Sequence, residues 1–211
     1  NNRLYQKVAH VFTGTGLRYP GITISGSIGA TGDSHTISGN IIGFGNFLGT
    51  ANTVISGSDS TFRAIEIPAA NNATATVIQG NTISGIDYTT NFQGGFSNAA
   101  GFVAIDLFGA NFQSAGLFNI SGNTIGSLDG SSTIVVRPPT QPSIGWTVAG
   151  IRGSNTPSTV SGNQIGAISI TATTTSSIGF KGIHFESGVP VTISNNVIGG
   201  SGPAGGCTRG C

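Results

Sequence analysis

The stretch "ISGNTIG" at residues 120–126 has four near-copies elsewhere in the chain. They are "ISGNIIG" at 37–43, "IQGNTIS" at 78–84, "VSGNQIG" at 160–166 and "ISNNVIG" at 193–199. The asparagine at the fourth position of each copy recurs at intervals of 41, 42, 40 and 33 residues. Self-similarity at such a period is typical of a solenoid, in which each repeat buries its apolar face against the next.

A second marker keeps step with the first. Each repeat contains a short apolar run before its asparagine: "GITI" at 21–24, "AIEI" at 64–67, "AIDL" at 104–107, "GIRG" at 150–153 and "GIHF" at 182–185. Two residues before each run stands an aromatic residue or, once, a valine: Tyr19, Phe62, Phe102, Val148 and Phe180. Because both markers persist while the segments between them vary in length, we predict five stacked repeats.

Each repeat contains three runs typical of short strands. The runs are rich in isoleucine and are separated by Gly, Asn and Ser. No amphipathic helical stripe appears, so we expect an all-β chain. The variable segments at 47–61, 86–101, 127–146 and 169–178 are expected to be loops. We divide the single domain into an entry or partial coil at 1–16, five coils at 17–200 and a Gly/Cys tail at 201–211.

The Gly-Asn pair in the repeat marks a corner between the second and third strands. Asn tolerates a left-handed backbone better than other non-Gly residues, and Gly removes the steric conflict before it. Stacked Asn side chains can also donate hydrogen bonds from coil to coil. We therefore predict a structural ladder of one asparagine per repeat: Asn40, Asn81, Asn123, Asn163 and Asn196.

With these repeats the chain resembles the right-handed parallel β-helix superfamily, which includes pectate lyases, polygalacturonases, phage tailspikes and large bacterial surface proteins. The "SGNxIG" copies are most like the repeat regions of large secreted bacterial surface proteins. The resemblance implies a right-handed parallel β-helix, or β-solenoid, of about five coils with three short strands each. It covers about residues 17–200.

The composition excludes several functional classes. The chain of 211 residues has 35 glycines, 7% charged residues and a net charge of +1. No basic cluster is available for nucleic acid, and no apolar run of eighteen residues for membrane insertion. Heavy use of Ser, Thr, Asn and Gly with only two cysteines is typical of an extracellular or cell-surface protein of bacteria. Cys207 and Cys211 are candidates for a disulfide within or between chains.

One column of residues concentrates the rare charges. The position after the repeated Ile of the first strand is occupied by Thr23, Glu66, Asp106, Arg152 and His184. Its neighbours are apolar and should point inward, so this column should point outward with one residue per coil. Glu186 should share the face.

The column suggests a candidate catalytic site. Glu66 and Asp106 could form the carboxylate pair of a retaining glycosidase, or bind Ca²⁺. The resemblance implies that a polysaccharide would lie along this face, where Arg152 or His184 could abstract a proton next to a uronate carboxylate. The other interpretation is a solvated ladder of ordinary cross-strand pairs. Thr23, Glu186 and Trp146 are candidate glycan contacts, although Trp146 could equally anchor a loop on the coils.

The sequence favours a structural or adhesive role over catalysis, because the repeat is regular and poor in catalytic residue types. The clustered aspartates of the polygalacturonases and of the lyase calcium sites are absent. We expect an extracellular segment of a surface adhesin, or a subunit that forms filaments by contact with other copies end to end. A polysaccharide lyase or glycosidase and a non-catalytic glycan-binding module remain alternatives. No cofactor other than Ca²⁺ is suggested.

Overall fold

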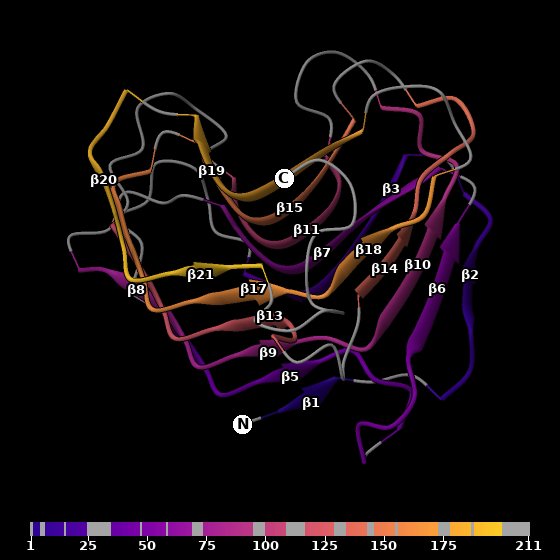
Figure 1. The fold of residues 1–211 in the computed structure, drawn as a ribbon, viewed down its shortest axis with the longest axis horizontal. Coiled ribbons are helices and arrows are strands. Elements are labelled where there is room, and N and C mark those ends of the chain that lie inside the picture. The colour runs from indigo at the N-terminus through magenta and orange to yellow at the C-terminus, as the bar shows by residue number, and fades with distance from the viewer. Residues whose placement is uncertain are drawn as a thin grey trace.

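The computed structural model describes residues 2–4, 7–14, 16–24, 35–46, 48–57, 59–68, 74–94, 100–108, 117–128, 134–142, 146–154, 156–172, 178–186 and 188–199. In this part of the chain all regular structure is β, in four parallel sheets. Successive strands visit the four sheets in turn, so every fourth strand returns to the same sheet one layer higher (Figure 1). We number the sheets after their first strands and call one circuit a coil. The arrangement is consistent with a β-solenoid.

Sheet 3 holds the longest strands and carries the predicted first strand of each repeat. Its strands are β3 (Leu17–Thr23), β7 (Ser60–Pro68), β11 (Ala100–Phe108), β15 (Thr147–Ser154) and β19 (Gly179–Glu186). Sheet 4 carries the predicted second strand. Its strands are β4 (Thr36–Ser38), β8 (Thr76–Gln79), β12 (Phe118–Ser121), β16 (Ser158–Ser161) and β20 (Val191–Ser194).

Sheet 1 follows the asparagine corner and carries the predicted third strand. Its six strands are β1 (Arg3–Leu4), β5 (Ile41–Ile42), β9 (Thr82–Ile83), β13 (Thr124–Gly126), β17 (Gln164–Gly166) and β21 (Val197–Ile198). Sheet 2 was not expected. Its strands are β2 (His10–Phe12), β6 (Thr53–Gly57), β10 (Ile86–Thr90), β14 (Ile134–Arg137) and β18 (Ile168–Ile170).

The prediction of three strands per coil is therefore wrong, because each coil has four. The strands of sheet 2 lie within or beside the segments expected to be loops. They alternate inward and outward like any half-buried strand, with Ile55, Tyr88 and Val136 buried in one register. Their residue types differ from coil to coil, so the alternation is visible only once pairing aligns them. Likewise β1 and β2 pair with β5 and β6, so residues of the 1–16 segment take part in the first coil.

Identical side chains stack through the interior. Ile65, Ile105 and Ile151 are in register on sheet 3 and fully buried. The fixed aromatic position stacks as well, with ring centroids 5.7 Å apart for Tyr19–Phe62 and 5.2 Å apart for Phe62–Phe102. Burying such apolar area contributes about 25 cal/mol per Å², and aromatic pairs add about 1 kcal/mol. The ladders thus fix the register, since a slip of one residue would turn every isoleucine outward.

The predicted asparagine ladder is present. Asn81 donates from its backbone N–H to the Asn123 Oδ1 (3.0 Å), and its Nδ2 donates to the same oxygen (2.9 Å). The same pair of bonds links each asparagine to the next up to Asn196, and Asn2 joins as a sixth member through Asn40. Each internal amide also bonds a carbonyl of the preceding coil, as Asn123 Nδ2 does with Ile78 O (2.9 Å).

We expected the left-handed backbone conformation at this corner to occur at the ladder asparagine, but it does not. It falls on the residue before, with φ between 60° and 64° at Gly39, Gly80, Gly122 and Gly162. In the last repeat Asn195 takes that place with φ 55°. The ladder position therefore needs Asn for its amide group, and the preceding position needs a residue that tolerates positive φ.

Candidate functional site

Sheet 3 bends in the middle of every strand, toward sheet 1 (Figure 1). The bend lies at the small residue before the repeated isoleucine, where the paired register skips a position in each pairing. A Cβ at Gly150 would lie 2.6 Å from the Gly182 carbonyl oxygen, so that position has no room for a side chain. From the bend onward, the side chains of Ala64 and Ile65 on β7 point inward and that of Glu66 points outward. This local geometry brings Arg63 onto the same outer face as Glu66.

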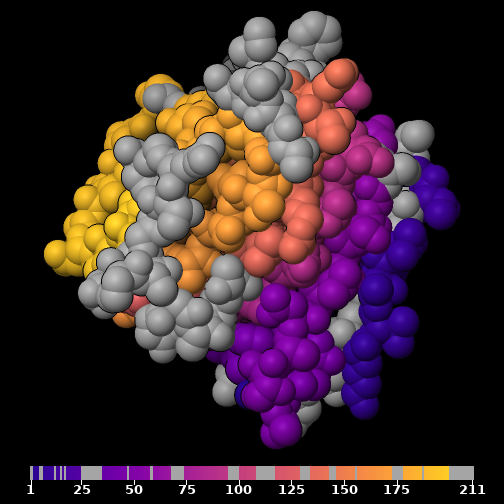
Figure 2. Space-filling view, turned by 45° about the vertical axis from the view of Figure 1, so that its right-hand side comes forward, coloured from indigo at the N-terminus to yellow at the C-terminus, as the bar shows by residue number. Residues whose placement is uncertain are grey.

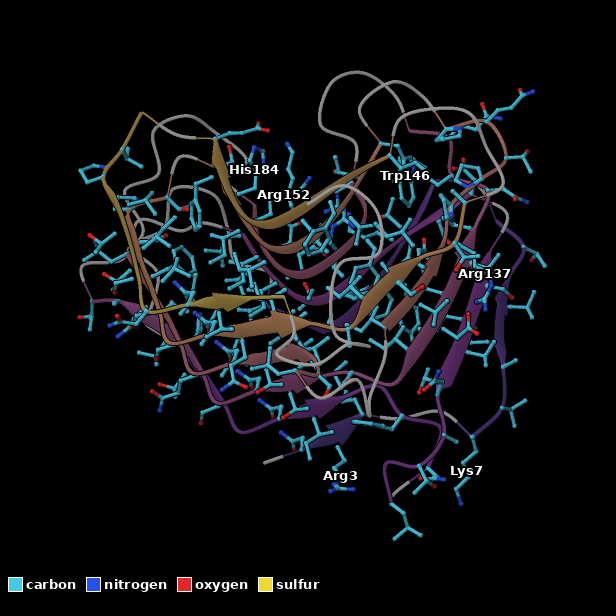
Figure 3. All side chains as sticks on the ribbon, in the orientation of Figure 1. Arg3, Lys7, Arg137, Trp146, Arg152 and His184 are labelled. Carbon is cyan, nitrogen blue, oxygen red and sulfur yellow. The ribbon has the colours of Figure 1, made fainter. Side chains whose placement is uncertain are left out.

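The predicted column exists on that outer face. Thr23 pairs with Glu66, Glu66 with Asp106, Asp106 with Arg152, and Arg152 with His184. Arg152 and His184 lie side by side on the outer surface of β15 and β19, as Figure 3 shows. The register thus stacks these five residues in one column, one per coil, and within it Glu66 and Asp106 are buried, at 7% and 1% exposed.

Asp106 lies between two arginines. Its Oδ2 accepts from Arg63 Nε at 2.7 Å, and its two oxygens accept from Arg152 Nε and Nη2 at 3.0 and 2.7 Å. Asp106 is 1% exposed and Arg63 is 4% exposed. The second pairing is of the bidentate type, which is the stronger geometry for an Arg–carboxylate pair. Burial lowers the pKa of Arg63 from its ordinary value to about 10, while the nearby Asp106 charge opposes that fall. Arg63 therefore stays protonated at neutral pH.

Arg63 is further fixed by the main chain. Its Nη1 donates to Phe62 O and its Nη2 to Ala100 O, both at 2.8 Å. A buried charge is tolerated only when it is paired and hydrogen-bonded, and here each of the three guanidinium nitrogens donates a hydrogen bond. The sequence interpretation missed Arg63, because simple alternation of a strand would place residue 63 on the face opposite to Glu66.

Glu66 pairs with Arg18, whose side chain is half exposed on β3. The two carboxylates expected as a glycosidase pair are thus neighbours in register, but each is engaged by arginine. They also fit a Ca²⁺ site poorly, since an arginine occupies the oxygen atoms that a cation would need. Among the described residues, no group of three His, Cys, Asp or Glu side chains could hold a metal ion.

His184 is the last member of the column, and its ring lies near one cation and one carboxylate. Its Nε2 lies 3.1 Å from Lys181 Nζ and 3.6 Å from a Glu186 carboxylate oxygen. Burial lowers the pKa of His184, and the charges of Lys181 and Arg152 lower it further, whereas Glu186 raises it. The ring is therefore neutral at pH 7. Glu186 shares the outer face as expected, while Lys181 comes from the position in register with Ala149 and was not anticipated.

The remaining candidate glycan contacts differ in exposure. Trp146 is fully buried in the core, its Nε1 donates to Phe92 O at 2.9 Å, and its ring fills the space beside Gly101. Because no face of the ring is exposed, it cannot stack on a sugar here, and the alternative role of an anchor accounts for it. Thr23 and Glu186 are exposed. Cys207 and Cys211 lie outside the described residues.

Comparisons with known proteins add no assignment. No protein-family model matches the chain, no curated protein matches it, and no solved structure matches it. In the described residues no helix is long and apolar enough to cross a membrane. The geometry of the coils and of the charged column is therefore the basis on which a function can be proposed.

Proposed function

We propose that this chain is an extracellular structural or adhesive segment, built as a right-handed parallel β-helix of about five coils. It is either part of a surface adhesin or a subunit of a filament. The observation that carries the proposal is the contrast between two sets of residues. The apolar and asparagine ladders run through every coil. In the outer column, by contrast, Glu66 and Asp106 form ion pairs with arginines of the same chain.

The ladders supply what a rigid spacer requires. Each coil contacts only its neighbours, so stability and length grow together as coils are added. Right-handedness is supported by the resemblance and by the strong preference for right-handed connections between parallel strands of one sheet. An extracellular location is supported by the composition, which has 7% charged residues and is rich in small polar residues.

Glycoside hydrolysis is the weaker proposal for this face. Such catalysis requires one carboxylic acid that donates a proton and one carboxylate that is free to act as nucleophile or base. Asp106 instead accepts hydrogen bonds from two guanidinium groups on both of its oxygens, so neither oxygen is free for that chemistry. Its burial also keeps it away from any polymer that lies on the surface.

A polysaccharide lyase is the second candidate, and one observation favours it. His184 is partly exposed and neutral, with two cations beside it. A neutral imidazole can act as a general base, and a nearby Lys181 or Arg152 could hold the substrate carboxylate. A non-catalytic glycan-binding module would use the exposed Thr23 and Glu186, since Trp146 is buried.

A panel of neutral and acidic polysaccharides separates these functions. The wild-type protein and the His184→Gln variant are incubated with each polymer, and new reducing ends and unsaturated uronates are measured. We expect no cleavage by either protein and straight, uniform particles in electron microscopy. Cleavage by the wild type that is lost in His184→Gln would replace the structural proposal with the lyase. Binding without cleavage would select the glycan-binding module.

A further inference from the structure

Within the described residues, the stack has two different edges. The first strand of each sheet, β1 to β4, forms one edge, and the last strands, β18 to β21, form the other. Figure 2 shows the coils as successive bands, with the indigo N-terminal residues and the yellow C-terminal residues at opposite sides of the molecule. Edge strands present unpaired N–H and C=O groups that can pair with another chain.

The last edge exposes residues of the interior ladders. Ile193 on β20 is 53% exposed and Ile198 on β21 is 52% exposed. Their counterparts one coil earlier, Val160 and Ile165, are fully buried. The same inward positions are therefore covered in the middle of the stack and uncovered at this edge, which is the signature of an interface for a further coil.

The first edge is hollow and apolar. A cavity of about 250 Å³ lies there, lined among others by Leu4, Tyr19, Ile42 and Phe62. Strand β1 lines this cavity through Arg3 and Leu4, which are also its only two residues paired with sheet 1. The side chain of Val8 is 78% exposed and does not contribute to filling this space. The first coil therefore contains unfilled space.

The strand counts of the two edges do not match directly. Sheet 1 has six strands and each of the other three has five. If β18, β19 and β20 of one copy paired with β2, β3 and β4 of a second copy, then β21 of the first copy would occupy the place of β1 in the second. The two strands match at the ladder asparagine and at the inward apolar residue, because "NVI" at 196–198 corresponds to "NRL" at 2–4, and they differ only at the middle residue, Val197 against Arg3.

The asparagine ladder fits this exchange. Asn2 donates from its N–H and Nδ2 to Asn40 Oδ1, both at 3.1 Å. Asn163 donates in the same way to Asn196 Oδ1 at 2.9 Å. Asn196 itself uses Nδ2 for Val160 O and Ser194 O, which is the arrangement of an internal ladder member with respect to the coil before it. Its backbone N–H then corresponds to the group that would reach Asn40 of a second copy.

We propose that copies of this chain stack head to tail by strand replacement, with β21 of one copy displacing β1 of the next. The proposal rests on the structural role and names its partner, a second copy. Four ladders then continue across the joint, with Phe180 on Tyr19, Ile183 on Ile22, Ile193 on Ile37, and Ile198 on Ile42 of the next copy. Such a contact joins two different surfaces and does not close, so it propagates as a filament.

Cysteine pairing tests the register. In a background with Cys207→Ser and Cys211→Ser, Thr36→Cys and Thr192→Cys are placed in separate proteins. Both positions are exposed and belong to one column of sheet 4. Across the joint they would be about 4.8 Å apart, a distance that a disulfide can span. Under mild oxidation we expect disulfide-linked dimers only when the two proteins are mixed. Replacing Thr192→Cys by Ser194→Cys, two residues out of register, should strongly reduce the dimers.

A deletion distinguishes replacement from simple stacking. Removing residues 1–4 should lower the protein concentration at which sedimentation detects assemblies, because β1 no longer competes for the place of β21. The variant Ile198→Lys should abolish assembly, whereas Val54→Lys, at an exposed outward position on β6, one strand inside the first edge, should not. Assembly that weakens when residues 1–4 are removed would overturn strand replacement.

The outcomes separate this proposal from the structural role. Dimers from either cysteine protein alone, or none from the mixture, would overturn the head-to-tail joint and leave the role of a rigid segment intact. Cleavage of a polysaccharide would overturn the structural role and leave the cross-linking result unchanged.

Discussion

The asparagine ladder should carry a large share of the stability, and Asn123→Ala measures it. Asn123 is fully buried at the centre of the ladder. The substitution removes four side-chain hydrogen bonds: two that its Nδ2 donates, to Ile78 O and Asn163 Oδ1, and two that its Oδ1 accepts from Asn81. It leaves the Asn81 N–H and the Ile78 carbonyl buried without these partners.

The expected loss follows from the count of bonds. Each hydrogen bond contributes about 1 kcal/mol net, and a buried group left without its partner costs about 1–3 kcal/mol. We therefore expect the free energy of unfolding to fall by about 4 kcal/mol, with part of the penalty relieved by relaxation. For a chain of this size such a loss lowers the melting temperature by roughly 8–16 °C.

Urea unfolding followed by far-UV circular dichroism provides the measurement. The matched control is Asn119→Ala, an exposed asparagine on β12 four residues earlier, for which a change within about 0.5 kcal/mol is expected. A loss below about 1 kcal/mol in Asn123→Ala, or an equal loss in both variants, would refute the claim that the amide ladder holds the coils together.

Three further outcomes follow from the geometry of sheet 3. Asp106→Asn removes the charge shared by the buried Arg63 and the partly exposed Arg152 and should cost about 3–5 kcal/mol in urea unfolding, whereas Glu186→Gln, on an exposed side chain, should stay within about 0.5 kcal/mol. Gly150→Ala should cost about 1–3 kcal/mol in the same assay because its Cβ would meet a carbonyl of the next coil, while Gly188→Ala, with nothing within 4 Å, should be neutral. Because the pKa of His184 is lower in the folded protein, the unfolded chain binds that proton more readily. The stability contributed by the neutral ring is present above the unfolded pKa of about 6.5, and it should be lost as the pH falls below that value toward the folded pKa. Unfolding of the wild type should therefore become easier from pH 7.5 to pH 5 by a larger amount than that of His184→Gln, and parallel pH profiles would contradict the assignment.

The sequence by itself determined the repeat, the parallel strands of three sheets and the two kinds of ladder. These features are local and recur at fixed spacing, so their period is visible in the letters. The isoleucines must face inward because only one face of each strand can be buried, and that requirement sets the register. The column from Thr23 to His184 followed from the same alternation.

Only the tertiary structure decided the rest. Sheet 2, which the sequence did not predict, is built from residues that differ between coils, and it becomes visible when pairing aligns them. The bend of sheet 3 at its small residues, Ala64 and Ala104 as well as Gly150, breaks simple alternation, because two successive side chains there point inward. That bend turns Arg63 toward Asp106, and so converts a column that suggested catalysis into a buried ion pair network. Such contacts join residues more than forty positions apart, and their geometry depends on how the coils stack.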